Sequence, residues 1–292
     1  MAKGRIIKAL SGFYYVASNG EIYQCKGRGV FRKKNITPLV GDMVTFDVSG
    51  EKEGYILEIH ERENELVRPP IANIDQAIIV TSAVEPAFNT TLLDRFLVLV
   101  ESKLIQPVIF FTKMDIAEQD RVRFESYQQD YQKIGYDVEL LSVKHRDHLS
   151  ILKRYLKDKI TVIAGQSGVG KTTLLNAIDP TLALKTGEIS TSLGRGRHTT
   201  RHVELLPMFG GLVADTPGFS SLEFQDLTVS ELTDCFPEIK QRTANCKFRG
   251  CTHIKEPKCA IKQAVENGEI ADYRYEHYVR FYEEIKLRKP RY

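Results

Sequence analysis

The chain has 292 residues, enough for two or three domains at roughly 100–200 residues each, and its 42% hydrophobic and 27% charged residues exclude a disordered protein. Forty-one basic residues against 38 acidic ones leave a net charge of only +3, so any nucleic-acid-binding surface must come from local clusters. No apolar run approaches the roughly 18–20 residues that span a bilayer, and the basic start lacks the apolar core of a secretory signal, so we expect a cytoplasmic protein with no membrane segment.

The N-terminal region contains short runs rich in β-branched and aromatic residues, separated by glycine, asparagine or charged turns. Such a series of five predicts a small closed barrel, and the OB fold is the commonest five-stranded choice. The predicted strands cover residues 4–10, 12–18, 21–27, 41–48 and 54–60.

A basic loop without acidic residues lies between the third and fourth of these strands, with Phe31 inside it. Loops of OB-type barrels carry nucleic-acid contacts, so this one is either an RNA-binding element or an ordinary solvated loop. Pro69 and Pro70 cannot continue a regular element, so we place the end of the barrel domain at residue 67. We expect this domain, residues 1–67, to bind RNA. The basic residues of the loop are Lys26, Arg28, Arg32, Lys33 and Lys34.

In the middle of the chain, apolar strand candidates alternate with helical patterns. This alternation predicts an α/β domain over residues 68–221, with a parallel sheet and helices on both faces. The strand candidates cover residues 74–83, 106–115, 136–144 and 159–168, and a helix is predicted over 91–103.

A glycine loop that follows the last of these strands matches the pattern G-x-x-x-x-G-K-[ST]. In this pattern the backbone N–H groups surround a phosphate chain, Lys171 reaches the β- and γ-phosphates, and the Thr172 hydroxyl coordinates Mg²⁺. The helix that begins at once directs its positive end at the anion. The predicted phosphate-binding residues are Gly165, Gln166, Ser167, Gly168, Val169, Gly170, Lys171, Thr172 and Thr173.

A second motif, Asp-Thr-Pro-Gly at residues 215–218, ends an apolar strand downstream of the phosphate loop. In P-loop NTPases an aspartate at such a strand end helps to hold the Mg²⁺ ion, and we assign this role to Asp215. The N–H of Gly218 is then placed to meet the γ-phosphate. On its own this motif is an ordinary turn, but its position after a phosphate loop makes it informative.

Between the two motifs, residues 194–202 form a glycine- and threonine-containing segment in the position of a GTPase first switch. A threonine there binds Mg²⁺ and senses the γ-phosphate, and we favour Thr199 with Thr200 as the alternative. Phe219 occupies the place where many GTPases have a glutamine that orients the attacking water, and a phenyl ring cannot do so. His198 is the best internal candidate for that task, and a catalytic group supplied from outside the chain is the alternative.

Residues 112–115, Thr-Lys-Met-Asp, resemble the Asn-Lys-x-Asp motif with which GTPases recognise guanine. In that motif the carboxylate, here Asp115, accepts two hydrogen bonds that adenine cannot donate, and the Lys113 stem covers the base. Thr112 replaces the asparagine and keeps only a hydroxyl for local hydrogen bonds. The predicted base-binding residues, including a loop that resembles the one packed on the base in GTPases, are Thr112, Lys113, Met114, Asp115, Ser142, Val143 and Lys144.

These motifs are complete but circularly permuted, because the base motif precedes the phosphate loop, the switch and the Asp-Thr-Pro-Gly motif. In Ras-like GTPases the phosphate loop comes first. A nucleotide site survives permutation because it is assembled from loops at one edge of the sheet. One consequence is that the chain runs from Gly218 directly into the C-terminal module.

The C-terminal region, residues 222–292, contains a cysteine and histidine cluster followed by a helical pattern over 271–288. Three cysteines and one histidine form a closed tetrahedral set suited to structural Zn²⁺, with no position left for metal catalysis. Few apolar residues surround the cluster, so we expect the metal to replace a core. Cys25 and Cys235 lie outside the cluster and are predicted to be ordinary buried thiols. The predicted zinc ligands are Cys246, Cys251, His253 and Cys259.

Together, the predicted barrel, the permuted motifs, the Gly-Arg-Gly-Arg-His-Thr-Thr segment and the cysteine and histidine module resemble the bacterial ribosome small-subunit-dependent GTPases over essentially the whole chain. The resemblance implies a multidomain protein: an all-β OB-type barrel, an α/β circularly permuted P-loop GTPase domain and a small α-helical zinc-binding domain. It also implies Mg²⁺-dependent GTP hydrolysis that the small subunit stimulates, coupled to release during late subunit maturation. Basic clusters on all three domains suit a large RNA surface, and we expect a monomer.

The sequence is also compatible with two other functions. A scaffold that binds RNA and nucleotide without meaningful turnover is compatible with Phe219, and a P-loop ATPase or small-molecule kinase is compatible with the phosphate loop alone. For the GTPase, the candidate catalytic residues are His198, Lys171 and Thr199.

Overall fold

The computed structural model describes residues 1–29, 31, 36–67, 69–142, 147–178, 203–215, 222–224 and 226–288. The chain forms two compact units, and each is built from two separate stretches of sequence. The first unit comprises residues 1–78 and 143–220, and the second comprises residues 79–142 and 221–292. Among the described residues, no helix is long and apolar enough to cross a membrane.

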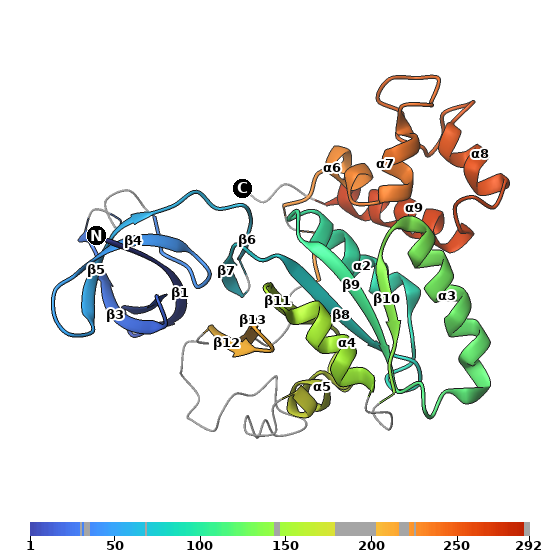
Figure 1. The fold of residues 1–292 in the computed structure, drawn as a ribbon. Helices are drawn as coiled ribbons and strands as arrows, with labels where there is room; N and C mark the ends of the chain where they lie inside the picture. Colours follow the sequence, from blue (N-terminus) through green and yellow to red (C-terminus); the bar gives the residue numbers. More distant parts are fainter. Residues whose placement is uncertain are drawn as a thin grey trace. The chain divides into compact units, whose positions relative to one another are not determined.

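Five N-terminal strands of the first unit form a closed barrel (Figure 1). The order β1-β2-β3-β5-β4 returns to β1 through a further β1–β4 pairing, and only β3 and β5 pair in parallel among these strands of the described chain. Alternate side chains fill the interior, where Ile6, Val16, Cys25, Phe46 and Ile56 are fully buried. The predicted OB-like barrel and its five strands are therefore confirmed. The strands are β1 (Ala2–Leu10), β2 (Phe13–Ser18), β3 (Glu21–Gly27), β4 (Met43–Val48) and β5 (Glu53–Ile59).

Phe31, the aromatic residue of the basic loop, is only 8% exposed and lies against Gly27 at the end of β3. The sequence interpretation counted this ring towards RNA binding. The structure instead buries it, so the ring is not exposed for stacking on a base. Residues 30 and 32–35, with three of the basic side chains, lie outside the described residues.

The two prolines after the barrel form part of a hairpin between β6 (Glu65–Val67) and β7 (Pro70–Ala72), in which Val67 pairs with Pro70. Neither proline continues β6, which ends at Val67, and Pro70 instead begins the next strand. As the first residue of a short strand, Pro70 occupies a position where the missing N–H is tolerated.

The remaining strands of the first unit position the phosphate loop. β11 (Ile160–Ala164) pairs in parallel with β13 (Gly211–Asp215), which pairs antiparallel with β12 (Glu204–Met208). Every residue of β11 is buried, which explains its continuous apolar sequence. Two helices flank it along the chain, α4 (Asp147–Leu156) and α5 (Lys171–Ile178).

The second unit contains a parallel pair of strands, β9 (Gln106–Thr112) and β10 (Asp137–Leu140), with β8 (Gln76–Ser82) on the other side of β9. β8 begins in the first unit and ends in the second. The intervening helices confirm the predicted alternation of strands and helices. These helices are α2 (Thr90–Glu101), η1 (Glu118–Asp120) and α3 (Arg121–Ile134).

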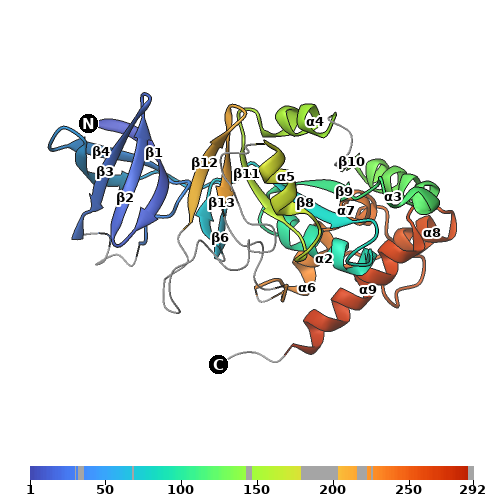
Figure 2. The same cartoon turned by 90° about the horizontal axis from the view of Figure 1, so that it is seen from below.

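The C-terminal module of the second unit has an apolar core of its own, in which Phe236, Ile261 and Phe281 pack with Val98 of α2. The prediction that the metal replaces a core is therefore wrong for the module as a whole, because apolar residues from distant parts of the chain supply one. The predicted helix over 271–288 is confirmed by α9, the long helix near the C-terminus in Figure 2. The helices are α6 (Val229–Asp234), α7 (Pro237–Thr243), α8 (Ala260–Glu266) and α9 (Asp272–Leu287).

A buried group of charged side chains fastens α9 to α2. Asp94 accepts hydrogen bonds from Arg274 (2.5 Å) and Tyr131 (2.7 Å), and its other oxygen pairs with His277 Nδ1 at 2.5 Å. Arg274 also donates through Nε to Glu238 on α7 at 2.7 Å. Asp94 and Arg274 are both fully buried. Because removing one partner leaves the other charge buried without compensation, this contact holds the three helices in one arrangement.

Candidate functional site

The phosphate loop connects β11 to α5 in the first unit. Gly165 and Gly170 have φ angles of 137° and 99°, which glycine adopts without the strain that a side chain would cause. Val169, only 1% exposed, anchors the loop in the core, and the Leu174 N–H bonds to the Gly170 carbonyl at the start of α5. The N–H groups of this loop and of the first helical turn are the donors that surround a phosphate chain.

Lys171 lies across the loop that precedes it. Its Nζ donates to the carbonyl oxygens of Gly165 (2.7 Å) and Gln166 (2.5 Å), and burial lowers the pKa of Lys171 to about 8. A partly desolvated ammonium that bonds to neutral carbonyls is stabilised further by an anion, since a phosphate offers charge as well as acceptor oxygens. Thr172, the predicted Mg²⁺ ligand, is buried at the start of the same helix.

The Asp-Thr-Pro-Gly motif begins beside the phosphate loop. β13 ends at Asp215 and runs parallel to β11, with Ile160 opposite Leu212 and Thr161 opposite Val213. The carboxyl ends of adjacent parallel strands meet at one edge of a sheet. The backbone of Asp215 therefore lies at the edge from which the phosphate loop starts.

The base motif follows β9 in the second unit. The Thr112 hydroxyl donates to the Thr81 carbonyl at 3.2 Å, and the Ala83 N–H donates to the Thr112 carbonyl at 3.0 Å. The residue that replaces the usual asparagine therefore ties β9 to the end of β8. Lys113 has a positive φ of 62°, and its Nζ donates to the Glu85 carbonyl. These contacts fix the first half of the motif on the sheet.

The second half of the motif meets the loop after β10. The Met114 N–H donates to the Leu141 carbonyl at 3.2 Å, which brings Asp115 and Ser142 into the same region of the second unit. Asp115 is half-buried. The Ser142 hydroxyl is buried and has no hydrogen-bond partner among the residues that the structure describes. A buried polar atom of this kind is normally satisfied by a ligand or water, which fits a base bound at this place.

The described parts of the predicted nucleotide site fall into two groups. The phosphate loop and Asp215 belong to the first unit, and the base motif with Ser142 belongs to the second. Other predicted residues lie outside the described residues: Val143, Lys144, His198, Thr199, Thr200, Gly218 and Phe219.

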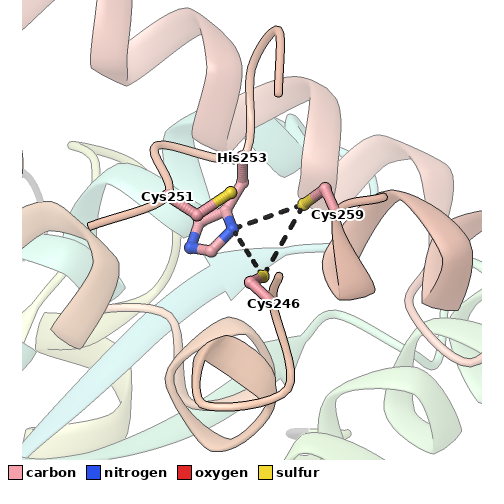
Figure 3. A group of neighbouring side chains, drawn as sticks. All are labelled: Cys246, Cys251, His253 and Cys259. Atoms are coloured by element: carbon pink, nitrogen blue, oxygen red, sulfur yellow. Dashed lines mark hydrogen bonds between the residues drawn. The ribbon is translucent and has the colours of Figure 1, made fainter. Parts of the chain in front are cut away.

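The four predicted zinc ligands point towards one another in the C-terminal module (Figure 3). Their ligand atoms all lie within 4.8 Å of one another. Cys246 Sγ is 3.9 Å from Cys259 Sγ, and His253 Nδ1 is 3.5 Å and 3.4 Å from these two sulfur atoms. With Zn–S bonds of about 2.3 Å, the edges of a tetrahedron measure about 3.8 Å. The cluster therefore fits a tetrahedral zinc ion.

The chemistry of the ligands also fits a cation. Burial lowers the pKa of His253, which favours the neutral imidazole that binds metals. Burial also raises the pKa of the Cys251 thiol to about 12. Such a thiol keeps its proton at neutral pH unless a positive charge replaces it, and Zn²⁺ supplies that charge.

Glu256 organises the metal loop, and the sequence reasoning missed it. Its carboxylate accepts hydrogen bonds from the Thr252 N–H (2.9 Å) and hydroxyl (2.7 Å) and from the N–H groups of Ile254 and Lys255 (both 3.1 Å). Although burial opposes it, the hydrogen bonds led by Thr252 lower the pKa of Glu256 to about 2. The available signal was one acid within an otherwise basic ligand loop.

His253 is held by three further contacts. Thr243 Oγ1 lies 3.4 Å from the imidazole Nε2, and the Tyr275 hydroxyl donates to the His253 carbonyl at 2.6 Å. The Tyr278 hydroxyl donates to the carbonyl of the preceding residue, Thr252, at 3.0 Å. Since a metal-binding histidine is oriented by the contacts of its other nitrogen and its backbone, these residues direct Nδ1 at the cysteines.

The chain is similar over its whole length to known proteins. The model of the RsgA GTPase family matches residues 59–225, and that of the RsgA N-terminal domain matches residues 3–56. Two relatives named small ribosomal subunit biogenesis GTPase, RsgA 2 of Oceanobacillus iheyensis and RsgA of Bacillus subtilis, are 64% and 60% identical, with full coverage of both chains.

Two crystal structures have the same fold. YloQ, described as a circularly permuted GTPase, has a TM-score of 0.87 and 56% identity over 100% of this chain and 97% of its own. YjeQ from Thermotoga maritima has a TM-score of 0.87 and 38% identity over 99% of both chains.

Proposed function

This chain belongs to the RsgA GTPase family, and we propose that it hydrolyses GTP during late maturation of the small ribosomal subunit. The observation that carries this proposal is full-length similarity to proteins named for that process, together with the permuted order of the motifs. The Lys171 ammonium over its glycine loop and the buried Ser142 hydroxyl, in the loop that the base motif contacts through Met114, support the two parts of a guanine-nucleotide site.

We assign the phosphates of GTP to residues 165–172 and the base to residues 112–115. The N–H groups of the loop and Lys171 bind the phosphate oxygens, and the Asp115 carboxylate selects guanine by accepting from its N1–H and amine. Mg²⁺ neutralises phosphate charge when it is bound with GTP. Thr172, Asp215 and Thr199 are the residues proposed to hold it.

The hydrolytic step needs a group that positions water, because Phe219 cannot. We assign this role to His198, whose imidazole either accepts a proton from water or orients it by a hydrogen bond. Slow turnover by the isolated protein and faster turnover on the ribosomal subunit follow if the subunit fixes this histidine or supplies the group itself.

The proposed partner is the small subunit and its ribosomal RNA. GTP favours docking, and hydrolysis to GDP favours release. In this scheme the domains at residues 1–67, 68–221 and 222–292 all meet RNA through their basic clusters. We place this activity in the cytoplasm, where small subunits mature, and propose that the protein acts as a monomer.

The direct test is turnover of GTP and ATP by the purified full-length protein, with and without isolated small subunits. We expect strong stimulation of GTP turnover and none of ATP turnover. Equal GTP rates with and without subunits would instead support a scaffold that binds nucleotide without a ribosome-controlled reaction, which Phe219 favours. Stimulated ATP turnover would contradict the assignment to guanine.

Base recognition is tested by Asp115→Asn. The substitution replaces one acceptor oxygen of the side chain by an NH₂ donor, which no longer matches the amine of guanine. GDP binding should weaken by at least about a hundredfold, because unpaired polar groups in a site built for hydrogen bonds are strongly disfavoured. Xanthosine diphosphate, which has a carbonyl in place of that amine, should be favoured. Asp137→Asn, which changes an exposed acid at the start of β10, is the control. Unchanged nucleotide preference in Asp115→Asn would remove these residues from the base site.

A further inference from the structure

Cys246 is the most exposed of the four zinc ligands. It is half-buried, whereas the other three ligands are buried, with exposed fractions of 8% for Cys251, 0% for His253 and 4% for Cys259. The residues next to it in the chain, 244–245 and 247–250, are all exposed. Figure 3 shows that Cys246 reaches the centre from a different segment than Cys251 and His253. The side of the zinc centre that faces solvent is therefore the one that carries Cys246.

The two halves of the centre are held in place differently. The segment around Cys246 forms local backbone turns, in which the N–H groups of Asn245 and Cys246 donate to carbonyls three residues earlier, at 2.9 Å and 3.2 Å. The half that contains His253 is instead fixed by side chains, because the Glu256 carboxylate and the Tyr275 and Tyr278 hydroxyls bind its backbone. A shift of Cys246 therefore disturbs local turns, whereas a shift of the other half breaks long-range contacts.

The nearest partner for the exposed sulfur is Cys259, whose Sγ lies 3.9 Å from Cys246 Sγ. A disulfide has an S–S length of about 2.05 Å, so the two sulfurs must approach each other by about 1.9 Å. Cys259 directly precedes α8, and the fully buried Ile261 fixes the start of this helix in the core. Cys246 is therefore the residue that moves, and its segment allows that movement.

The chemistry of the centre makes Cys246 reactive as well as accessible. Cysteines that bind zinc are thiolates at neutral pH, and the thiolate is the form that oxidants attack. Lys247 and Arg249 flank Cys246, and residues 244–251 contain no acid. Neighbouring cations stabilise the thiolate and the hydroxide that leaves when a peroxide reacts. An exposed thiolate with a second cysteine in reach is the arrangement found at oxidation-sensitive sites.

We propose that Cys246 is an oxidation site for hydrogen peroxide and that Cys259 is the cysteine that converts the oxidised sulfur into a disulfide. The Cys246 thiolate attacks one peroxide oxygen, the O–O bond breaks, hydroxide leaves, and Cys246 becomes a sulfenic acid. The Cys259 thiolate then displaces a second hydroxide from that sulfur and forms the S–S bond. The two sulfurs lose two electrons in all, and solvent protonates both hydroxides to water.

The disulfide removes two of the four ligands, so the centre should release its zinc. Cys251 and His253 alone do not complete the tetrahedral set that structural zinc requires. The proposal needs only the zinc centre and goes beyond the proposed GTPase function, on which it does not depend.

The test treats the full-length, zinc-loaded protein with hydrogen peroxide, follows zinc release with a chromophoric indicator and maps the disulfide by mass spectrometry. Trypsin places each of the three cysteines in its own peptide, because lysines separate them in the sequence. We expect zinc to leave as two thiols are lost, with the Cys246 peptide joined to the Cys259 peptide. Dithiothreitol followed by added zinc should reverse both changes. The proposal is overturned if peroxide releases no zinc, if the bridge joins Cys251 to Cys259, or if zinc leaves without a bridge at Cys246.

Cys246→His separates oxidation of this residue from general sensitivity of the centre. The imidazole keeps a zinc ligand at this position, because two cysteines and two histidines also form a tetrahedral zinc set. It cannot form a disulfide, so peroxide should release zinc at least about tenfold more slowly than from the wild type. Cys251→His makes the same exchange at a buried ligand, keeps Cys246 and Cys259, and should release zinc as the wild type does.

Release from Cys246→His at the wild-type rate, or an equal slowing in Cys251→His, would contradict the assignment to Cys246. If a histidine prevents zinc loading, the disulfide map of the unsubstituted protein decides the proposal on its own. Failure of small subunits to stimulate GTP turnover would contradict the proposed function and leave this result unaffected.

Discussion

The phosphate loop and the zinc centre are both short segments of the chain, but the first is held in place by its backbone and the second by its side chains. The loop depends on backbone conformation, with positive φ at its glycines and one buried valine as an anchor. The zinc centre depends on side chains, four as ligands and the Glu256 carboxylate as the acceptor for three N–H groups. Substitutions in the loop should therefore change nucleotide affinity, whereas substitutions at the centre should change zinc affinity and the stability of its module.

Removing a zinc ligand is the strongest way to separate the two regions. Cys246→Ala should abolish stoichiometric zinc binding. It should also lower the free energy of unfolding by about 4 kcal/mol, because the free energy of metal binding contributes to the stability of the folded chain. The core around Phe236 and Phe281 should keep α9 helical. Zinc analysis and urea denaturation of the full chain measure both effects.

The control for this experiment is Cys235→Ala, which removes a buried thiol from the same core but leaves the four ligands unchanged. It should retain zinc. A Cys246→Ala protein that still carries one equivalent of zinc would show that the tetrahedral set is assigned wrongly.

A matched change in the loop is Gly170→Ala. Its φ of 99° is a conformation that L side chains rarely adopt, so the N–H groups should turn away from the phosphates. We expect GDP affinity, measured by calorimetry, to fall about a hundredfold, the loss of one or two charge-assisted hydrogen bonds. Gly135→Ala strains a similar conformation, φ 111°, at the end of α3 and should leave GDP affinity unchanged. Equal losses in both variants would indicate general destabilisation.

The contribution of the carboxylate behind the metal loop is tested by Glu256→Gln. The amide cannot reproduce the charge that four donor groups share, so zinc affinity should fall about thirtyfold, within the usual range for residues that orient metal ligands. Competition with a chromophoric chelator measures it. Glu266→Gln, at the exposed end of α8, should have no effect. Unchanged affinity in Glu256→Gln would mean that the ligands organise themselves.

Nucleotide binding by the phosphate loop should also depend on pH. Because burial lowers the pKa of Lys171 to about 8, its ammonium is charged below that pH and loses its proton above it. Phosphate binds the charged form, so GDP affinity should fall about tenfold between pH 7 and pH 9. Lys171→Arg remains charged throughout and should give a flat profile. A flat profile for the wild type would contradict the burial of this ammonium.

The sequence predicted those features whose residues lie close together in the chain. The barrel strands, the strand–loop–helix context of Lys171 and the four-residue zinc cluster all carry local patterns. The ion pair of Arg95 with Glu284 carries none, because its partners are 189 positions apart and each residue is ordinary in its own helix. Phe31 was misread for a related reason, since a ring in a basic loop is indistinguishable by sequence from a ring that packs on the barrel.

The two compact units are each made of two stretches of chain, and this has a consequence for synthesis. Asp94 and Arg274 are 180 positions apart, so the ribosome makes the buried face of α2 long before it makes the helix that covers it. At roughly 5–20 residues per second, the delay is about 10 to 40 seconds.

During that interval the nascent chain carries an apolar helix face with a carboxylate in the middle of it, and the charge opposes unwanted association of this surface with other apolar surfaces. Folding of the first unit is also delayed, because β11 and β13 are synthesised after the first half of the second unit. A chain that stops before α9 therefore leaves translation with its barrel closed but without a finished second unit.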